Sequence, residues 1–381
     1  MTTSNPASTV ENTKQSPFMG LLTGPTIGSV MNQHRGAGPG FDAIRIGLSL
    51  AIMFWHCFQI SYGNRIIPEL QASIFYPLTL SMVPLFFCLS GFLITGSAVR
   101  TNSVRIFLTN RILRIVPALA VEVTLCCVIL GGIQTTLPLQ EYYSSYGFYR
   151  YFGNIIGMIT LVLPGVFEGN PFPNVVNGNL WTLQPEYYCY LFMTMLMVTG
   201  IVYNRVLYSL IFGFAVMLLT IFNLKTGFGR NIVFFPPWTV VYYFFVGIFM
   251  YHWRHKIPLN VVLFLICAAL SYVMISRRLT FVVAFPLAYC MLYVGMQKIP
   301  PIPLLSRGDY SYGVYLFSFP IQQTLVLLFP SLREWWALFL VATPLTIAFA
   351  ALSWHLFEKP TLKLKKHLSG KPASAPVTNV A

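Results

Sequence analysis

Two basic residues lie on one face of the first long apolar segment of the sequence. Arg45 and His56 are eleven positions apart, in a stretch that is apolar from about residue 43 to residue 62. In an α-helix, eleven residues return to within about 20° of the same face and rise about 16 Å. Histidine exchanges protons near neutral pH, which suits a general base. The spacing favours a catalytic face with His56 and Arg45 as candidate catalytic residues; a histidine that only hydrogen bonds to a neighbouring helix is the alternative.

A second pair of basic residues precedes the third apolar segment. Arg111 and Arg114 are three positions apart, so their side chains are neighbours on one face of a helix and can close on one anion. Guanidinium groups bind phosphate in a fixed planar geometry. We therefore interpret Arg111 and Arg114 as a site for a phosphorylated cofactor that approaches from the cytosol. A cluster that only sets membrane orientation, or that binds lipid phosphate, remains the alternative.

A carboxylate stands near the start of a later apolar segment. Glu186 directly follows Pro185, and proline interrupts the hydrogen bonds of a helix backbone. A carboxylate in this position is suited to orient His56, to stabilise its imidazolium form or to bind a sugar hydroxyl. The alternative is an ion pair between Glu186 and an arginine that serves assembly alone.

The elements that must position these residues are apolar. The chain has 381 residues, of which 56% are hydrophobic and 9% are charged. Soluble globular domains carry roughly 25% charged residues, so a soluble enzyme is excluded, as are a disordered chain and collagen. The seven cysteines have no CxxC spacing and lie in apolar stretches, so we expect no metal site and no disulfide framework.

Ten apolar segments have the length of about 17 to 25 residues that spans a bilayer. They lie near residues 43–62, 75–97, 112–133, 181–203, 206–222, 233–251, 258–275, 279–296, 310–330 and 336–356. A further segment near 152–167 is short and is interrupted by glycine and proline, so we expect it to dip into the outer leaflet or to lie along it. The predicted fold class is an all-α integral membrane protein, a bundle of about ten transmembrane helices with one extra short membrane-associated segment.

The distribution of basic residues predicts the orientation. Lys and Arg number 24 against 10 Asp and Glu, giving a net charge of +14. With ten spans, most basic residues fall on one side, which the positive-inside rule identifies as the cytoplasm. We therefore expect a multi-pass protein of the bacterial inner membrane with both termini cytoplasmic. The excess of positive charge is then explained by orientation in a lipid bilayer, and nucleic acid is excluded as a partner.

The largest predicted extracytoplasmic feature is the segment from about residue 134 to residue 180. It is rich in tyrosine and asparagine. Aromatic and amide side chains suit a sugar, which offers apolar faces and many hydroxyl groups. An aromatic belt at the membrane interface is the alternative interpretation.

Six motifs in order along the chain resemble those of one family, the acyltransferase 3 group of integral-membrane acyltransferases. The resemblance extends from Phe41 to about Lys366, which we take as a transmembrane acyltransferase domain (41–366). A flexible cytoplasmic tail (1–40) and a disordered tail (367–381) are expected to flank it. The motifs are Phe41-Asp42-Ala43-Ile44-Arg45 followed by His56, Ser90-Gly91-Phe92-Leu93-Ile94, Arg111-x-x-Arg114 with Pro117, Trp181-Thr182-Leu183 with Glu186, Asp309-Tyr310-Ser311-Tyr312-Gly313-Val314-Tyr315-Leu316, and Ser353-Trp354-His355-Leu356-Phe357-Glu358-Lys359-Pro360.

The resemblance implies a membrane-bound O-acyltransferase. Such an enzyme moves an acyl group, here expected to be acetyl, from cytosolic acetyl-CoA or another acyl-CoA to a glycan hydroxyl. The acceptor class is exopolysaccharide, lipopolysaccharide or nodulation oligosaccharide. His56 would act as general base or as acyl carrier. The resemblance also implies acyl-CoA binding by Arg111 and Arg114. We expect the oxyanion donor to come from among Arg45, Ser90 and Tyr310, which the sequence does not rank, and Trp181 and Glu186 to position the acceptor or His56.

Two departures from the family pattern and two rival functions remain. Ser318 follows the Tyr315-Leu316-Phe317 stretch, where many members carry a histidine. The chain also lacks the C-terminal esterase-like domain of some members, so we expect it to act alone or with a separate polysaccharide-assembly protein. The main rival is a transporter or flippase for a glycan or small anion, with Arg45, His56 and Glu186 as a relay. A non-catalytic subunit of a polysaccharide synthase complex is the other.

Overall fold

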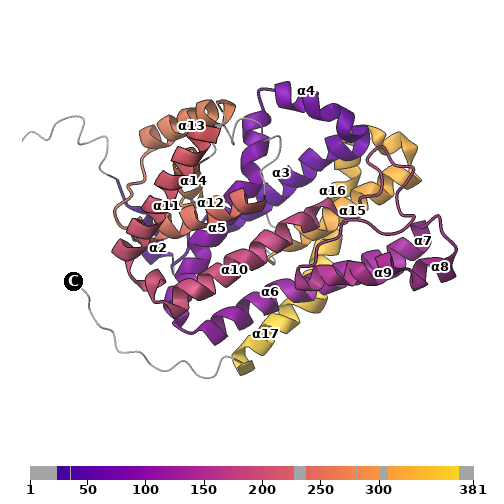
Figure 1. Cartoon of the computed structure of the whole chain (residues 1–381), viewed down its shortest axis with the longest axis horizontal. Helices are drawn as coiled ribbons and strands as arrows, with labels where there is room; N and C mark the ends of the chain where they lie inside the picture. Colours follow the sequence, from indigo (N-terminus) through magenta and orange to yellow (C-terminus); the bar gives the residue numbers. More distant parts are fainter. Residues whose placement is uncertain are drawn as a thin grey trace, which may run out of the picture.

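The described residues form an all-helical fold, which confirms the predicted class for this part of the chain (Figure 1). The structure is a computed structural model that describes residues 24–34, 36–226, 237–277, 279, 281–300 and 308–368, with side chains up to residue 364. Within these ranges β-pairing is limited to isolated bridges, such as the one between Thr26 and Pro258.

Ten helices of twelve or more residues make up the body of the fold. They are α3 (Phe41–Tyr62), α5 (Tyr76–Thr101), α6 (Val104–Thr124), α10 (Leu183–Val198), α11 (Arg205–Thr226), α12 (Pro237–Trp253), α13 (Val261–Ser276), α14 (Ala284–Gly295), α15 (Ser311–Leu328) and α16 (Trp335–Ser353). The π-helical turn Leu125–Leu130 continues α6 into α7 (Gly131–Gln134), and a second one, Trp354–Glu358, continues α16 into α17 (Lys359–Leu368). The remaining short helices are α2 (Ile27–Gln33), α4 (Ile67–Ala72), α8 (Leu139–Ser144) and α9 (Tyr146–Tyr151).

The expected count of ten membrane spans is not confirmed. A helix occupies each of the ten expected segments, but within the described residues five helices are long and apolar enough to cross a membrane. These are Phe41–Ala72, Tyr76–Thr101, Val104–Gln134, Arg205–Thr226 and Trp335–Leu364. The others are shorter or more polar. For example, α14 has 12 residues and is about 18 Å long, whereas the hydrocarbon core is about 30 Å thick.

The segment near 152–167 does not form a spanning helix. It begins as the 3₁₀ turn Phe152–Ile156 and continues as an irregular loop to residue 177. Bridges from Thr135 to Val166 and from Val162 to Val175 fold this loop onto itself and onto the end of α7. Together with α8 and α9, the loop lies at the opposite end of the view from α11, α13 and α14 (Figure 1).

Part of the expected N-terminal tail is a packed helix. Residues 27–33 form α2, in which Ile27 and Met31 are buried. The amide of Ile27 donates a hydrogen bond to the carbonyl of Ile257, so α2 is attached to the segment after α12. Residues 1–23 and 369–381, for which we expected flexible or disordered tails, lie outside the described residues.

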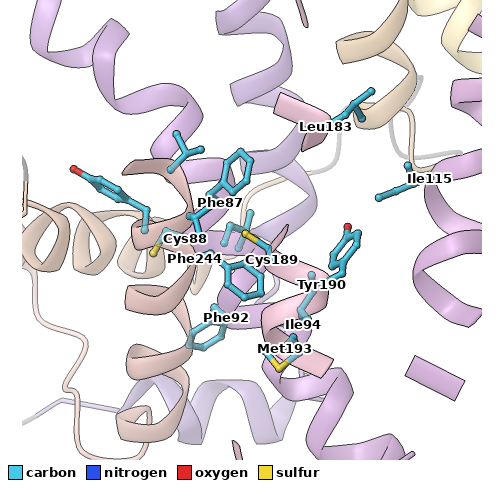
Figure 2. Close-up of a cluster of buried hydrophobic side chains, with 14 of the residues drawn as sticks. Phe87, Cys88, Phe92, Ile94, Ile115, Leu183, Cys189, Tyr190, Met193 and Phe244 are labelled. Carbon is cyan, nitrogen blue, oxygen red and sulfur yellow. The ribbon is translucent and has the colours of Figure 1, made fainter. Parts of the chain in front are cut away.

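Two glycines allow α5 and α12 to pack closely. A Cβ atom at Gly91 would collide with the carbonyl oxygen of Phe244, and one at Gly247 would collide with the carbonyl oxygen of Cys88. Small residues permit this approach of two backbones in membrane helices. Around the contact, Phe87 and Phe92 of α5 join Phe244 and side chains of α10 in the main hydrophobic cluster (Figure 2).

The loop before α10 is fixed to a proline site in α15. Pro320 has no N–H, so the carbonyl of Leu316, four residues earlier, has no partner in its own helix. The Asn177 amide donates to that carbonyl at 2.9 Å, and the Asn179 amide donates to the carbonyl of Tyr315 at 2.6 Å. These bonds place the start of α10, and with it Glu186, against α15.

Candidate active site

An elongated cavity of about 460 Å³ lies among α5, α6, α10 and α15. Its wall includes side chains of α5 from Val83 to Arg100, which is 17 positions further along the helix, a rise of about 25 Å. Ligand sites in proteins are commonly concave spaces of roughly 300 to 1,000 Å³. The cavity therefore has the size of a ligand site and the length to hold an extended molecule.

The two ends of the cavity differ in chemistry. One end is lined by the four arginines Arg45, Arg100, Arg111 and Arg114. The other end is lined by apolar groups that include Val83, Phe86 and Leu183. There the hydroxyl oxygens of Thr182 and Tyr315, which both line the cavity, are 2.8 Å apart and share a hydrogen bond. We call these the cationic end and the apolar end.

Asp309 binds two of the four arginines. Its Oδ2 atom accepts from Arg45 at 2.7 Å and from Arg114 at 2.7 Å, while Oδ1 accepts from the Ser311 hydroxyl at 2.8 Å. Burial alone would raise the pKa of Asp309, but the two guanidinium charges outweigh it and hold this pKa below its ordinary value. Asp309 is therefore ionised at neutral pH and joins α3, α6 and the start of α15.

The guanidinium of Arg114 forms ion pairs and also contacts aromatic rings. Besides Asp309, its guanidinium donates to Glu358 at 2.8 Å. It also lies over the rings of Tyr312 and Trp354, at 5.5 Å and 5.9 Å from their centroids. These contacts connect α6 to α15 and to the π-helical turn after α16.

Arg111 has very different surroundings from Arg114. Among the described residues it forms no ion pair, and its buried Nε atom has no hydrogen-bond partner. Its guanidinium lies 5.9 Å from the centroid of the Phe107 ring. The structure thus brings both arginines to the cavity, as the spacing predicts, but of the two only Arg114 forms ion pairs. The Glu186 carboxylate acts on Arg111 electrostatically without an ion-pair contact.

Glu186 and Ser90 also line the cavity. The carboxylate of Glu186 accepts a hydrogen bond from the hydroxyl of Tyr190, one turn further along α10. In Figure 2 the Tyr190 hydroxyl points away from Met193 and Phe92, out of the hydrophobic cluster. Neighbouring side chains of α10 thus serve both the apolar core and the cavity.

Three predicted site residues are not among those that line the cavity. The imidazole of His56 lies against the Phe319 ring, with 5.0 Å between centroids, and its buried Nδ1 atom has no partner among the described residues. Trp181 is partly buried against the main hydrophobic cluster. The hydroxyl of Tyr310 is 3.0 Å from Nε2 of His355.

The structure adds residues that the sequence analysis did not select. Asp309 and Glu358 belong to two of the six motifs, but no role was predicted for them or for Arg100. Thr182 and Tyr315 likewise stand in quoted motifs without a role. No spacing rule could select Asp309 as the partner of Arg114, because the two residues are 195 positions apart.

Five long apolar helices and an internal cavity are the features of a helical integral membrane protein that could hold a ligand among its helices. Residues 39–355 match the family described as Acyltransferase domain. The chain belongs to this acyltransferase 3 family and is a membrane acyltransferase.

Two curated proteins resemble the chain over most of their lengths. Nodulation protein 10 of Rhizobium leguminosarum bv. viciae is 26% identical over 371 residues, covering 90% of this chain and 98% of that protein. An O-acetyl transferase of Shigella phage Sf6 is 25% identical over 343 residues, covering 84% of this chain and 94% of that protein. No solved structure matches the chain.

Proposed function

We propose that the protein transfers an acetyl group from cytosolic acetyl-CoA to a hydroxyl group of a cell-envelope or secreted glycan. The acyltransferase family supports the reaction class, and the similarity to an O-acetyl transferase supports acetyl as the transferred group. The similarity to a nodulation protein is compatible with a glycan acceptor, which is part of the proposal. In this proposal the cationic end of the cavity faces the cytosol, and both termini lie on that side.

The observation that carries the proposal is the division of the cavity into a cationic and an apolar end. Acyl-CoA is a long molecule with phosphates at one end and a thioester at the other. Its phosphates match Arg100 and Arg111, which have no carboxylate partner among the described residues. Its acyl end matches the apolar wall, about 25 Å away along α5.

The reaction requires a group that accepts the hydroxyl proton and a group that donates a hydrogen bond to the oxyanion of the tetrahedral intermediate. The acceptor hydroxyl attacks the thioester carbon, the C–S bond breaks, and CoA leaves as a thiol. His56 takes the hydroxyl proton as general base, or carries the acyl group between the two substrates. Ser90 lines the cavity and is suited to donate to the oxyanion. The contact of Tyr310 with His355 does not support the same role for Tyr310.

His56 must gain access to the donor for this mechanism to operate. Tyr315 lines the apolar end, and Phe319, one turn later on α15, contacts His56. A side-chain movement of Phe319 or Tyr315 would connect the cavity to the space around His56. Glu186 lines the cavity and is suited to bind an acceptor hydroxyl or to stabilise the imidazolium that then forms.

Transfer of labelled acetyl tests the proposal. In one experiment, membranes that contain the protein are incubated with radiolabelled acetyl-CoA. In a second, envelope glycans from a deletion strain and from the same strain carrying the restored gene are compared by mass spectrometry. We expect label on the glycan with wild-type protein and none with His56→Ala protein inserted at the same level. A transporter would leave the acetyl group on CoA. Label on His56 after denaturation would identify the acyl carrier; its absence with active enzyme would identify the general base.

A further inference from the structure

The guanidinium of Arg100 lies beside two glycines at the cationic end of the cavity. Its Nη1 atom lies 3.4 Å from the position of a Cβ atom at Gly36 and 3.2 Å from that of a Cβ atom at Gly96. Gly96 is four residues earlier on the same face of α5, so the arginine side chain is folded back along its helix, towards the interior of the cavity. Gly96 itself lines the cavity beside Arg100.

The cationic end has more positive charge than its carboxylates compensate. Among the described residues, every ion pair involves Arg45 or Arg114, and Arg100, Arg111 and Arg254 have none. Arg254 lies 4.0 Å from the ring centroid of Tyr251, which lines the cavity. Burial lowers the pKa of Arg254, and the nearby charge of Arg100 lowers it further.

Arg100 is exposed and Arg111 is half-buried, and the Glu186 carboxylate acts on Arg111 electrostatically without an ion-pair contact. Neither guanidinium is held by a carboxylate, so both are free to bind an anion that enters the cavity, and repulsion between the like charges favours such binding. Arg100 and Arg111 come from different helices. A ligand that satisfies both must carry phosphate groups that are separated along its length. CoA fits this description, because its 3′-phosphate is distant from its diphosphate.

We propose that Arg100 and Arg111 bind separate phosphates of the acyl donor, Arg100 the 3′-phosphate and Arg111 the diphosphate. Arg114 then supports the site through Asp309 and Glu358 instead of binding phosphate. The proposal rests on the proposed function, since it takes acyl-CoA as the donor. It adds a binding residue outside the Arg111-x-x-Arg114 motif and divides the two motif arginines between two tasks.

Affinity measurements with two ligands test this assignment. Purified protein in phosphatidylcholine nanodiscs is titrated with CoA and with 3′-dephospho-CoA. Arg100→Gln should weaken CoA binding about tenfold or more, as expected for loss of a charge-assisted hydrogen bond, and leave dephospho-CoA binding within about twofold. Arg111→Gln should weaken both ligands. Arg105→Gln is the matched control, because Arg105 is exposed on α6 and does not line the cavity.

A second variant separates position from charge. In Gly96→Ala, the added methyl group would lie 3.0 Å from the Tyr251 ring and 3.2 Å from Nη1 of Arg100, so both groups must shift by a few tenths of an ångström while the arginine keeps its charge. We expect weaker CoA binding and little change for dephospho-CoA. Gly47→Ala is the control, because a Cβ atom there would have no neighbour within 4 Å.

The outcomes are distinguishable. Equal CoA affinity in wild type and Arg100→Gln, or an equal loss for CoA and dephospho-CoA, would overturn the assignment of Arg100 to the 3′-phosphate. Absence of CoA binding in the wild type would instead overturn the proposed function. If Arg100→Gln changes only the retention of phosphatidylglycerol in mixed nanodiscs, the ligand of Arg100 is a lipid headgroup, and the proposal is wrong.

Discussion

The imidazole of His56 forms a T-shaped contact with the ring of Phe319, with 5.0 Å between their centroids. Arg45, on the same helix as His56, lines the cavity, whereas His56 is not one of the residues that line it. Arg45 and His56 therefore have the spacing of one helix face, but only Arg45 lines the cavity. Whether a molecule bound in the cavity can reach His56 can therefore be tested by mutation.

Replacement of Phe319 should open that access. In Phe319→Ala, loss of the ring leaves space beside His56, so water and the thioester can meet the imidazole without the acceptor. We expect acceptor-independent hydrolysis of acetyl-CoA to rise several-fold, measured as free thiol with a disulfide reagent. The rise should disappear in the double variant Phe319→Ala/His56→Ala.

The control for this variant is Phe339→Ala on α16. Phe339 packs against Phe54 of α3 with 5.2 Å between ring centroids, and it does not line the cavity. Its removal takes away a phenylalanine ring that packs against the same helix as His56, though a less buried one than Phe319, and does not open the cavity towards His56. Equal hydrolysis rates in both variants would show that Phe319 is not the barrier.

The Asp309 carboxylate should contribute to stability. Asp309→Asn leaves Arg45 and Arg114 without their shared negative partner, and loss of one member of a buried ion pair is strongly destabilising. Because these side chains retain some exposure, we expect about 2 kcal/mol, seen as a melting temperature several degrees lower in detergent. Asp42→Asn is the matched control: Asp42 also faces Arg45, at 3.8 Å, but is 97% exposed, so its loss should have little effect.

The same carboxylate predicts a pH dependence. The pKa of Asp309 is lower in the folded protein than its ordinary value: burial opposes this shift, but the two arginines outweigh burial. Its stabilising effect is therefore complete above the unfolded-state pKa and is lost as the pH falls through the folded-state pKa. Between about pH 5 and pH 2, the melting temperature of the wild-type protein should fall by more than that of Asp309→Asn. An equal fall of the melting temperature with pH in the two proteins would contradict the prediction.

The contact between α5 and α12 should not tolerate a side chain at Gly91. In Gly91→Ala the methyl group collides with the carbonyl of Phe244, so the two helices must separate. We expect a loss of at least about 2 kcal/mol and a low yield of monodisperse protein in size-exclusion chromatography. Gly213→Ala, on α11, has open space within 4 Å and should be stable or slightly more stable. Similar behaviour of both variants would exclude a role for close packing at Gly91.

The sequence by itself determined the class of the protein and several of the polar residues that line the cavity. High apolar content and the length of the segments predicted an all-helical membrane protein, because helices satisfy their own backbone hydrogen bonds in lipid. Helical spacing placed Arg111 and Arg114 on one face, and both line the cavity with Arg45, Ser90 and Glu186. Local periodicity carries this information, since it depends on neighbours within one helix.

Tertiary structure decided which charges are compensated and which are free. Asp309 meets Arg114 across 195 positions of sequence, and Glu358 meets it across 244. No spacing rule links such distant positions, so the different surroundings of Arg111 and Arg114 appear only when α6, α15 and the turn after α16 pack together. The separation of His56 from the cavity has the same origin, because the position of Phe319 depends on how α15 packs against α3.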